Sequence, residues 1–160
     1  MKAAISKIQE ILSSVTDPEI PVLTIQDLGI VRDVIVNNNE AEIIITPTYS
    51  GCPAMDAIAF DIRLKLMEKG YKNVKISQVL SPAWTTDWMT EEGKEKLRQY
   101  GIAPPHRIQQ LLSSGEPASV ICPRCSSSNT QLLSQFGSTA CKALYQCNDC
   151  KEPFDYFKCH

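Results

Sequence analysis

The sequence lacks any apolar run of the roughly 20 residues that a membrane-spanning helix requires. We also expect no secretory leader, because Lys2 and Lys7 stand within the first nine residues, where a secretory signal keeps its side chains apolar. Seven cysteines without such a leader favour a reducing compartment, where thiols bind metals rather than form disulfides. We therefore expect a cytoplasmic protein that does not associate with membranes.

An excess of positive charge is also absent. Residues 1–105 carry 11 basic and 14 acidic side chains, and residues 106–160 carry 5 basic and 4 acidic ones, so the net charges are −3 and +1. Proteins that bind nucleic acid normally present a strongly basic surface. A nucleic-acid-binding role is therefore the weakest alternative, and we expect no nucleic acid among the partners.

The motifs of several enzyme classes are missing too. There is no glycine-rich dinucleotide fingerprint, no flavin motif and no paired Glu-x-x-His set for a di-iron centre. A thiol enzyme with Cys52 as its nucleophile has no base nearby in the sequence, because the two histidines are His106 and His160. We therefore expect no catalysis by this chain alone.

Two C-x-x-C pairs near the end of the chain are the strongest chemical signal. Cys122 and Cys125 are separated by 21 residues from Cys147 and Cys150. A two-residue spacer lets both thiolates of one tight turn reach a single ion, so the four residues predict a tetrahedral zinc site. Residues 131–136 and 142–146 suit a hairpin between the pairs, and residues 151–158 suit a third strand, which together describe a zinc ribbon.

Three potential ligands remain outside this set. They are Cys141, Cys159 and His160, and either cysteine can replace a ligand of the ribbon or join a second site. Two disulfides are the alternative to zinc, but they require an oxidising compartment. The metal should supply most of the stability of so small a unit.

The rest of the chain predicts an α/β domain with the element order α-β-β-α-β-α. Apolar periodicity indicates helices over residues 2–15, 53–69 and 90–100, and a hairpin over 30–48 precedes a strand over 74–80. The strand–helix–strand passage predicts a parallel crossover, hence a small open mixed sheet. We expect domains at 1–103 and 121–160, joined by a proline- and serine-rich linker at 104–120 that contains His106 as a solvated residue.

Cys52 follows Gly51 and precedes Pro53, at the predicted start of the second helix. A thiol there faces free N–H groups and the positive end of the helix dipole, so we expect a lowered pKa and a thiolate that can bind metal. The alternative is a small buried cysteine that only packs. Asp17 and Glu19 lie in a proline-flanked turn, where Asp17 either caps its own backbone or supplies an oxygen ligand.

Several stretches together resemble a known family. Asp17-Pro18-Glu19-Ile20-Pro21, Asp27-Leu28-Gly29-Ile30-Val31 and Thr48-Tyr49-Ser50-Gly51-Cys52-Pro53 are similar to the small α/β domain of iron–sulfur cluster assembly factors. The ribbon, with residues 136–145 and 152–159, resembles PaaD, a family that belongs to the bacterial phenylacetyl-CoA epoxidase system. The combined resemblance covers nearly the whole chain.

This resemblance implies an accessory protein of phenylacetate degradation. It would assist assembly of a metal or iron–sulfur centre of the oxygenase or its reductase, and those subunits would be its partners. A [2Fe–2S] cluster needs four protein ligands, whereas this domain offers Cys52 with Asp17 and Glu19 as oxygen donors. Iron or a cluster there would be held transiently, shared across a homodimer, or completed by a ribbon cysteine. A purely structural bridging subunit is the main alternative.

Overall fold

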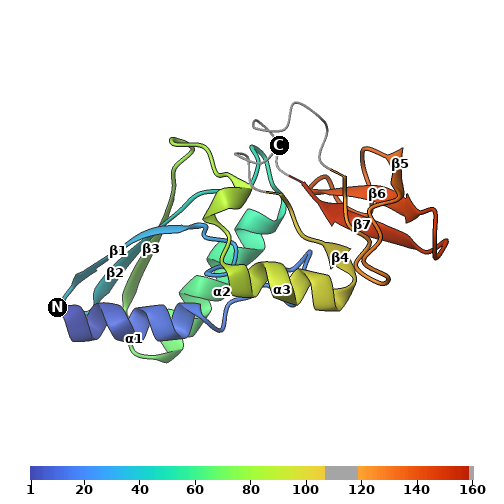
Figure 1. Ribbon diagram of the computed structural model, residues 1–160. Helices are drawn as coiled ribbons and strands as arrows, with labels where there is room; N and C mark the ends of the chain where they lie inside the picture. The colour runs from blue at the N-terminus through green and yellow to red at the C-terminus, as the bar shows by residue number, and fades with distance from the viewer. Residues whose placement is uncertain (107–118, 159–160) are drawn as a thin grey trace. The chain divides into compact units, whose positions relative to one another are not determined.

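The computed structural model describes residues 1–106 and 119–158 (Figure 1). The chain divides into two compact units between Trp84 and Thr85. Within the described residues, no helix is long and apolar enough to cross a membrane.

The first unit is a three-stranded sheet covered by helices. Its elements are α1 (Lys2–Leu12), β1 (Val31–Asn37), β2 (Glu40–Ile45), α2 (Ala54–Glu68) and β3 (Asn73–Gln78). The strand order is β1-β2-β3, with β1 antiparallel and β3 parallel to β2. The predicted α/β fold class, the hairpin and the parallel crossover through α2 are thereby confirmed.

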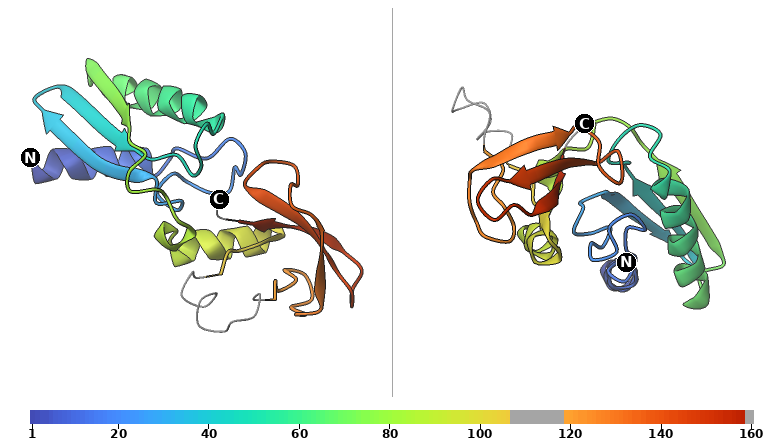
Figure 2. Two further views of the ribbon diagram at one scale, coloured as in Figure 1. Left: turned by 90° about the horizontal axis from the view of Figure 1, so that it is seen from above. Right: turned by 90° about the vertical axis from the view of Figure 1, so that its right-hand side faces the viewer.

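One face of this sheet is apolar and buried. Alternate residues of β1 and β2, such as Val34 and its partner Ile43, point into the core, because side chains of a strand alternate between its two faces. Ile8 from α1 and Ile62 from α2 are fully buried, α1 contacts α2 and β1, and α2 contacts β3. Figure 2 shows α2 running alongside β3.

Helix α1 ends three residues before the predicted end at residue 15. The hydroxyl groups of Ser13 and Ser14 donate hydrogen bonds to the carbonyls of Glu10 and Ile11, at 2.6 and 2.7 Å. These side-chain bonds occupy carbonyl groups of the last turn and favour the end of the helix at Leu12, six residues before Pro18. Trp84 closes the unit as a packing residue, with its indole N–H donating to the carbonyl of Leu28 at 2.7 Å.

The second unit combines a helix with a ribbon. It contains the 3-10 turn Thr86–Trp88, α3 (Glu91–Tyr100), β4 (Ile102–Ala103), β5 (Thr130–Ser134), β6 (Lys142–Cys147) and β7 (Pro153–Phe157). The hairpin β5–β6 and the third strand β7 are antiparallel neighbours, as predicted. Thr90 caps α3 by accepting a hydrogen bond from the N–H of Gly93 at 2.9 Å.

The boundary between the two compact units lies after Trp84, whereas the predicted first domain ends at residue 103. The sequence places residues 85–103 with the first domain, whereas in the structure β4 pairs in parallel with β7 and so extends the ribbon sheet to four strands. Val120, at the end of the predicted linker, belongs to the ribbon core with Cys122 and Phe154. Independent folding of residues 1–103 stays a prediction.

Candidate metal centre and the Cys52 turn

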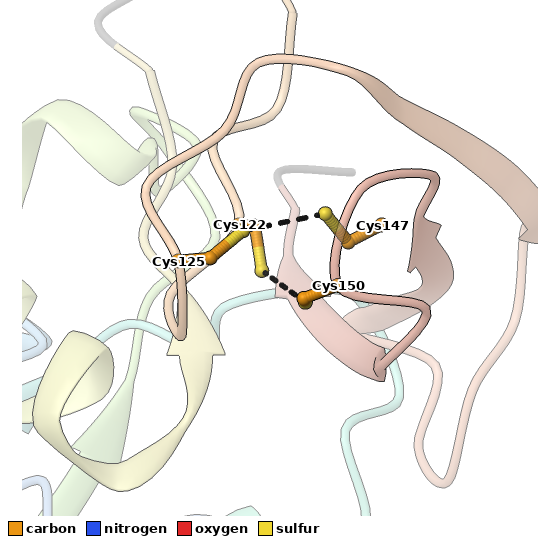
Figure 3. A group of neighbouring side chains, drawn as sticks. All are labelled: Cys122, Cys125, Cys147 and Cys150. Atoms are coloured by element: carbon orange, nitrogen blue, oxygen red, sulfur yellow. Dashed lines mark hydrogen bonds between the residues drawn. The ribbon is translucent and has the colours of Figure 1, made fainter.

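The four cysteines of the two C-x-x-C pairs converge in the second unit. Their sulfur atoms all lie within 4.8 Å of one another, and Figure 3 shows them meeting from two separate turns. The Cys122 and Cys150 sulfurs are 3.8 Å apart, and those of Cys125 and Cys147 are 3.5 Å apart. Tetrahedral thiolates with Zn–S bonds of about 2.3 Å have sulfurs separated by roughly 3.8 Å, so these residues fit a four-thiolate metal site.

Both turns are built by the same backbone pattern. The residue four positions after the first cysteine has positive φ in each turn, at Ser126 (φ 61°) and at Lys151 (φ 66°). The N–H of Cys122 donates to the carbonyl of Ser127 at 2.9 Å, and the N–H of Cys147 donates to that of Glu152 at 3.0 Å. These bonds close each turn around its pair of sulfurs before any metal is added.

A polar network ties the two turns together. The carboxylate of Asp149 accepts hydrogen bonds from the Ser127 hydroxyl and, at 3.0 Å, from the Asn129 amide. The Asn148 amide in turn donates to the Asn129 side chain at 3.0 Å. The two hydrogen bonds hold the pKa of Asp149 below its usual value. We name Ser127, Asn129, Asn148 and Asp149 the clasp.

The sulfurs are electrostatically unequal. The N–H groups of Cys150 and Asp149 lower the pKa of Cys147 to about 7. The N–H of Ser127 lowers the pKa of Cys125, but the neighbouring thiols, Cys147 foremost, raise it to about 12. One thiolate is thus stabilised while further ionisation is opposed by repulsion. A divalent cation removes that repulsion and allows all four thiols to deprotonate.

Cys52 occupies the second site, in the turn that leads into α2. Pro53 is the N-cap and Cys52 is half-buried immediately before it, close to the predicted position. Burial raises the pKa of the Cys52 thiol. The N–H of Ala54 and a hydrogen bond from the Tyr49 side chain oppose this effect, whereas the negative charges of Glu19 and Asp17 reinforce it. The predicted lowering of this pKa is wrong, because burial outweighs the helix N-terminus.

Asp17 adopts the turn expected of a capping residue. One of its carboxylate oxygens accepts hydrogen bonds from the N–H groups of Glu19 and Ile20, at 2.7 and 3.1 Å. The turn therefore holds Asp17 and Glu19 within electrostatic reach of Cys52. Among residues 1–106 and 119–158, however, the ribbon cysteines are the one group whose ligand atoms converge as a metal set. Asp17, Glu19 and Cys52 are neighbours rather than a finished site.

The remaining predicted ligands lie elsewhere. Cys141 is buried and its sulfur lies 3.0 Å from the Thr139 hydroxyl, outside the convergent group. His106 is half-buried, with its ring centroid 6.2 Å from that of Tyr156, so its predicted role as a solvated linker residue is wrong. Cys159, His160 and residues 107–118 of the predicted linker lie outside the described residues.

The matches to known proteins agree with both halves of this architecture. Residues 5–77 match the family described as iron–sulfur cluster assembly protein, and residues 107–158 match the PaaD zinc beta ribbon domain. A protein of Escherichia coli (strain K12), named as the D component of a "Putative 1,2-phenylacetyl-CoA epoxidase", is 52% identical over 157 residues, which are 97% of this chain and 93% of that protein. The chain belongs to the PaaD family.

Further relatives of this PaaD-family chain correspond to part of its length. The "Fe-S protein maturation auxiliary factor" of Porphyromonas gingivalis (strain ATCC BAA-308 / W83) is 40% identical over 92 residues, 56% of this chain and 87% of that protein. The crystal structure of a DUF59 domain from Bacillus anthracis is 31% identical, with a TM-score of 0.57, over 60% of this chain and 92% of its own. The conserved hypothetical protein TM0487 of Thermotoga maritima is 26% identical, with a TM-score of 0.50. The match covers 57% of this chain and 91% of that protein.

Proposed function

We propose that this protein is a maturation factor of the phenylacetyl-CoA epoxidase system, which assists assembly of a metal or iron–sulfur centre in the oxygenase or its reductase. The other subunits of that system are its clients and partners. The observation that carries the proposal is the incomplete site at Cys52. One thiol with two nearby carboxylates can bind iron weakly and release it, whereas a site with a complete ligand set retains its metal.

The charge around Cys52 supports a cationic cargo. Glu19 and Asp17 disfavour the thiolate while no cation is present, and the same negative charges attract Fe²⁺ or a positively charged cluster core. Binding of the cation would lower the thiol pKa and create the ligand at the moment it is needed. Missing ligands would come from the client or from a second copy of this chain.

We assign a structural role to the ribbon site, with zinc as its metal. Zinc would be held by Cys122, Cys125, Cys147 and Cys150 and would stabilise the fold without redox chemistry. The sulfur separations of 3.5 and 3.8 Å and the two closed turns support this assignment. The ribbon would then serve as a fixed surface for binding a protein client.

The proposal is tested by the metal content of the clients. The oxygenase and reductase would be produced in a strain without this protein, complemented with wild type, Cys52→Ala or Ser50→Ala. Ser50 is exposed in the same turn and provides the matched control. We expect iron and acid-labile sulfide per client to fall with Cys52→Ala and to remain normal with Ser50→Ala.

A bridging subunit would give another result. It would co-purify with the oxygenase, and client iron would be the same with Cys52→Ala as with wild type. That outcome, or normal client metal in the strain without this protein, would contradict the proposed maturation role.

A further inference from the structure

Helix α2 is apolar on two opposite sides. The inner side packs into the core of its unit through buried residues that include Ile58, Ile62 and Leu66. The outer side carries four exposed apolar residues, of which Phe60 is 66%, Leu64 46% and Met67 54% accessible. We name this set the outer stripe: Ala57, Phe60, Leu64 and Met67. A helix at a protein surface normally has polar residues on its solvent side, so this stripe is suited to contact with another molecule.

The spacing of the outer stripe indicates what would pack on it. Its members follow one another at intervals of three, four and three residues, which is the a/d pattern of a two-helix seam. A hollow of about 480 Å³ borders Met67 and is lined also by Ile35 and Arg63. This hollow offers space for a side chain of a partner next to the seam.

The charges along the stripe select among partners. Asp61 and Glu68 flank one edge, and Asp56 and Arg63 flank the other, so the seam has a net charge of −2. Asp61 also lies 3.5 Å from Lys65, but such a partly exposed pair contributes little and leaves the carboxylate available. A helix with basic residues beside its apolar seam would complement this pattern.

A second copy of this chain fits the stripe less well. Two antiparallel α2 helices would place their symmetry axis near the middle of the seam, beside Asp61 and Arg63. Each of these residues would then face the same residue of the other copy, and like charges across a helical seam are unfavourable. The charge pattern therefore favours a different protein.

We propose that the outer stripe of α2 binds a basic amphipathic helix of a partner protein. The stripe begins at Ala57, five residues after Cys52 in the sequence. The proposal goes beyond the metal role of Cys52 and does not depend on it, because the stripe and the Cys52 turn share no residue.

Two synthetic 21-residue peptides test the proposal with the full-length, metal-loaded protein. Both have leucine at every a and d position; the basic peptide has lysine at e and g, and the acidic peptide has glutamate there. Like charges at e and g keep each peptide from pairing with itself. We expect the basic peptide to bind more tightly in fluorescence anisotropy, and Phe60→Gln with Leu64→Gln to weaken it about tenfold or more.

Two further variants distinguish binding at the outer stripe from nonspecific hydrophobic binding. Leu80→Gln removes an exposed apolar side chain outside α2 and should leave binding unchanged. Asp61→Lys with Glu68→Lys should transfer the preference to the acidic peptide. Equal binding of both peptides, or binding of neither, would overturn the proposal. So would concentration-dependent dimers in sedimentation that Phe60→Gln dissociates, because the occupant would then be a second copy.

Discussion

The two thiol sites of this chain differ in how much is assembled before a metal arrives. In the ribbon, two turns with matching backbone conformations and a polar clasp hold four sulfurs within 4.8 Å. At Cys52, a turn brings two carboxylates near one half-buried thiol whose pKa burial raises. The ribbon cysteines are arranged to hold a metal, whereas under the proposed function the Cys52 turn would bind its cargo transiently.

The two sites also differ in the groups that act on the thiolate. The N–H groups that lower the pKa of Cys147 to about 7 stabilise a thiolate without any cation. Beside Cys52, burial is the main cause that raises the thiol pKa, and the negative charges of Glu19 and Asp17 raise it further. The first arrangement favours a thiolate in the absence of metal, and under the proposed function the second would make thiolate formation depend on an arriving cation.

Loss of a ribbon ligand should produce the largest effect. Cys147→Ser removes a buried thiolate, and we expect zinc affinity to fall by more than about a hundredfold, since even loss of an outer partner costs 10- to 100-fold. Zinc release to a chromophoric chelator measures this. Cys52→Ser should keep one zinc per chain; zinc loss there too would remove the distinction between the sites.

Unfolding should remain local when the zinc is removed. Hydrogen exchange after chelation should show lost protection in β5, β6 and β7 and retained protection in β1 to β3, because the core of the first unit contains no ribbon cysteine. Simultaneous loss of protection in both units would contradict this division.

Loss of the clasp should have an intermediate effect. Asp149→Ala removes the acceptor for Ser127 and Asn129, and we expect zinc affinity to fall about 10- to 100-fold. Glu152→Gln is the matched control, because Glu152 lies in the same turn and its side chain contacts Arg124 only at 4.0 Å. An equal loss of zinc affinity in Asp149→Ala and Glu152→Gln would mean that the net charge of the turn, rather than the clasp, determines how tightly zinc is held.

Changes at Asp17 should affect stability more modestly. Asp17→Ala leaves the N–H groups of Glu19 and Ile20 without their acceptor and should destabilise the first unit by about 1–2 kcal/mol. Asp17→Asn retains an acceptor oxygen and should cost less. Urea unfolding, monitored by amide hydrogen exchange in residues 1–84, measures the stability of both variants. Equal losses of stability in Asp17→Ala and Asp17→Asn would show that the charge of Asp17, not its capping hydrogen bonds, makes the main contribution.

The smallest effect should be on the reactivity of Cys52. Because its pKa is raised, alkylation of the peptide that contains it should require a higher pH than alkylation of a free thiol. Glu19→Gln should move this midpoint to lower pH, since it removes a negative charge, and Ser50→Ala should leave it in place. Mass spectrometry of that peptide gives the rate. A midpoint below that of a free thiol would contradict the account of the turn.

The sequence predicted features that depend on neighbours along the chain. Two-residue spacers determine the ribbon turns, and the periodicity of residues 54–68 predicts α2. The clasp is not predictable from local sequence, because Ser127 and Asp149 are 22 residues apart and meet only when the two turns come together. The polar residues beside each cysteine pair, Ser127-Ser128-Asn129 and Asn148-Asp149, were the available signal.

Features that depend on burial were harder to predict. The expected lowering of the Cys52 pKa rested on the helix N-terminus, which is local, whereas the raised value follows from desolvation by the folded unit. Likewise, the pattern of α2 shows where apolar residues recur, but only the fold reveals that Phe60, Leu64 and Met67 remain accessible.

Metal and sulfide analysis of anaerobically prepared protein tests most directly whether the ribbon holds zinc while the Cys52 turn binds iron. Wild type and Cys52→Ala would be dialysed to equilibrium against Fe²⁺ and sulfide. Zinc, and iron and sulfide in excess of the dialysate, would then be measured per chain without desalting, so that weakly bound iron is kept. We predict one zinc in both proteins, and iron that is present in wild type and lost in Cys52→Ala. Equal iron in the two proteins, or loss of zinc together with Cys52, would contradict the account.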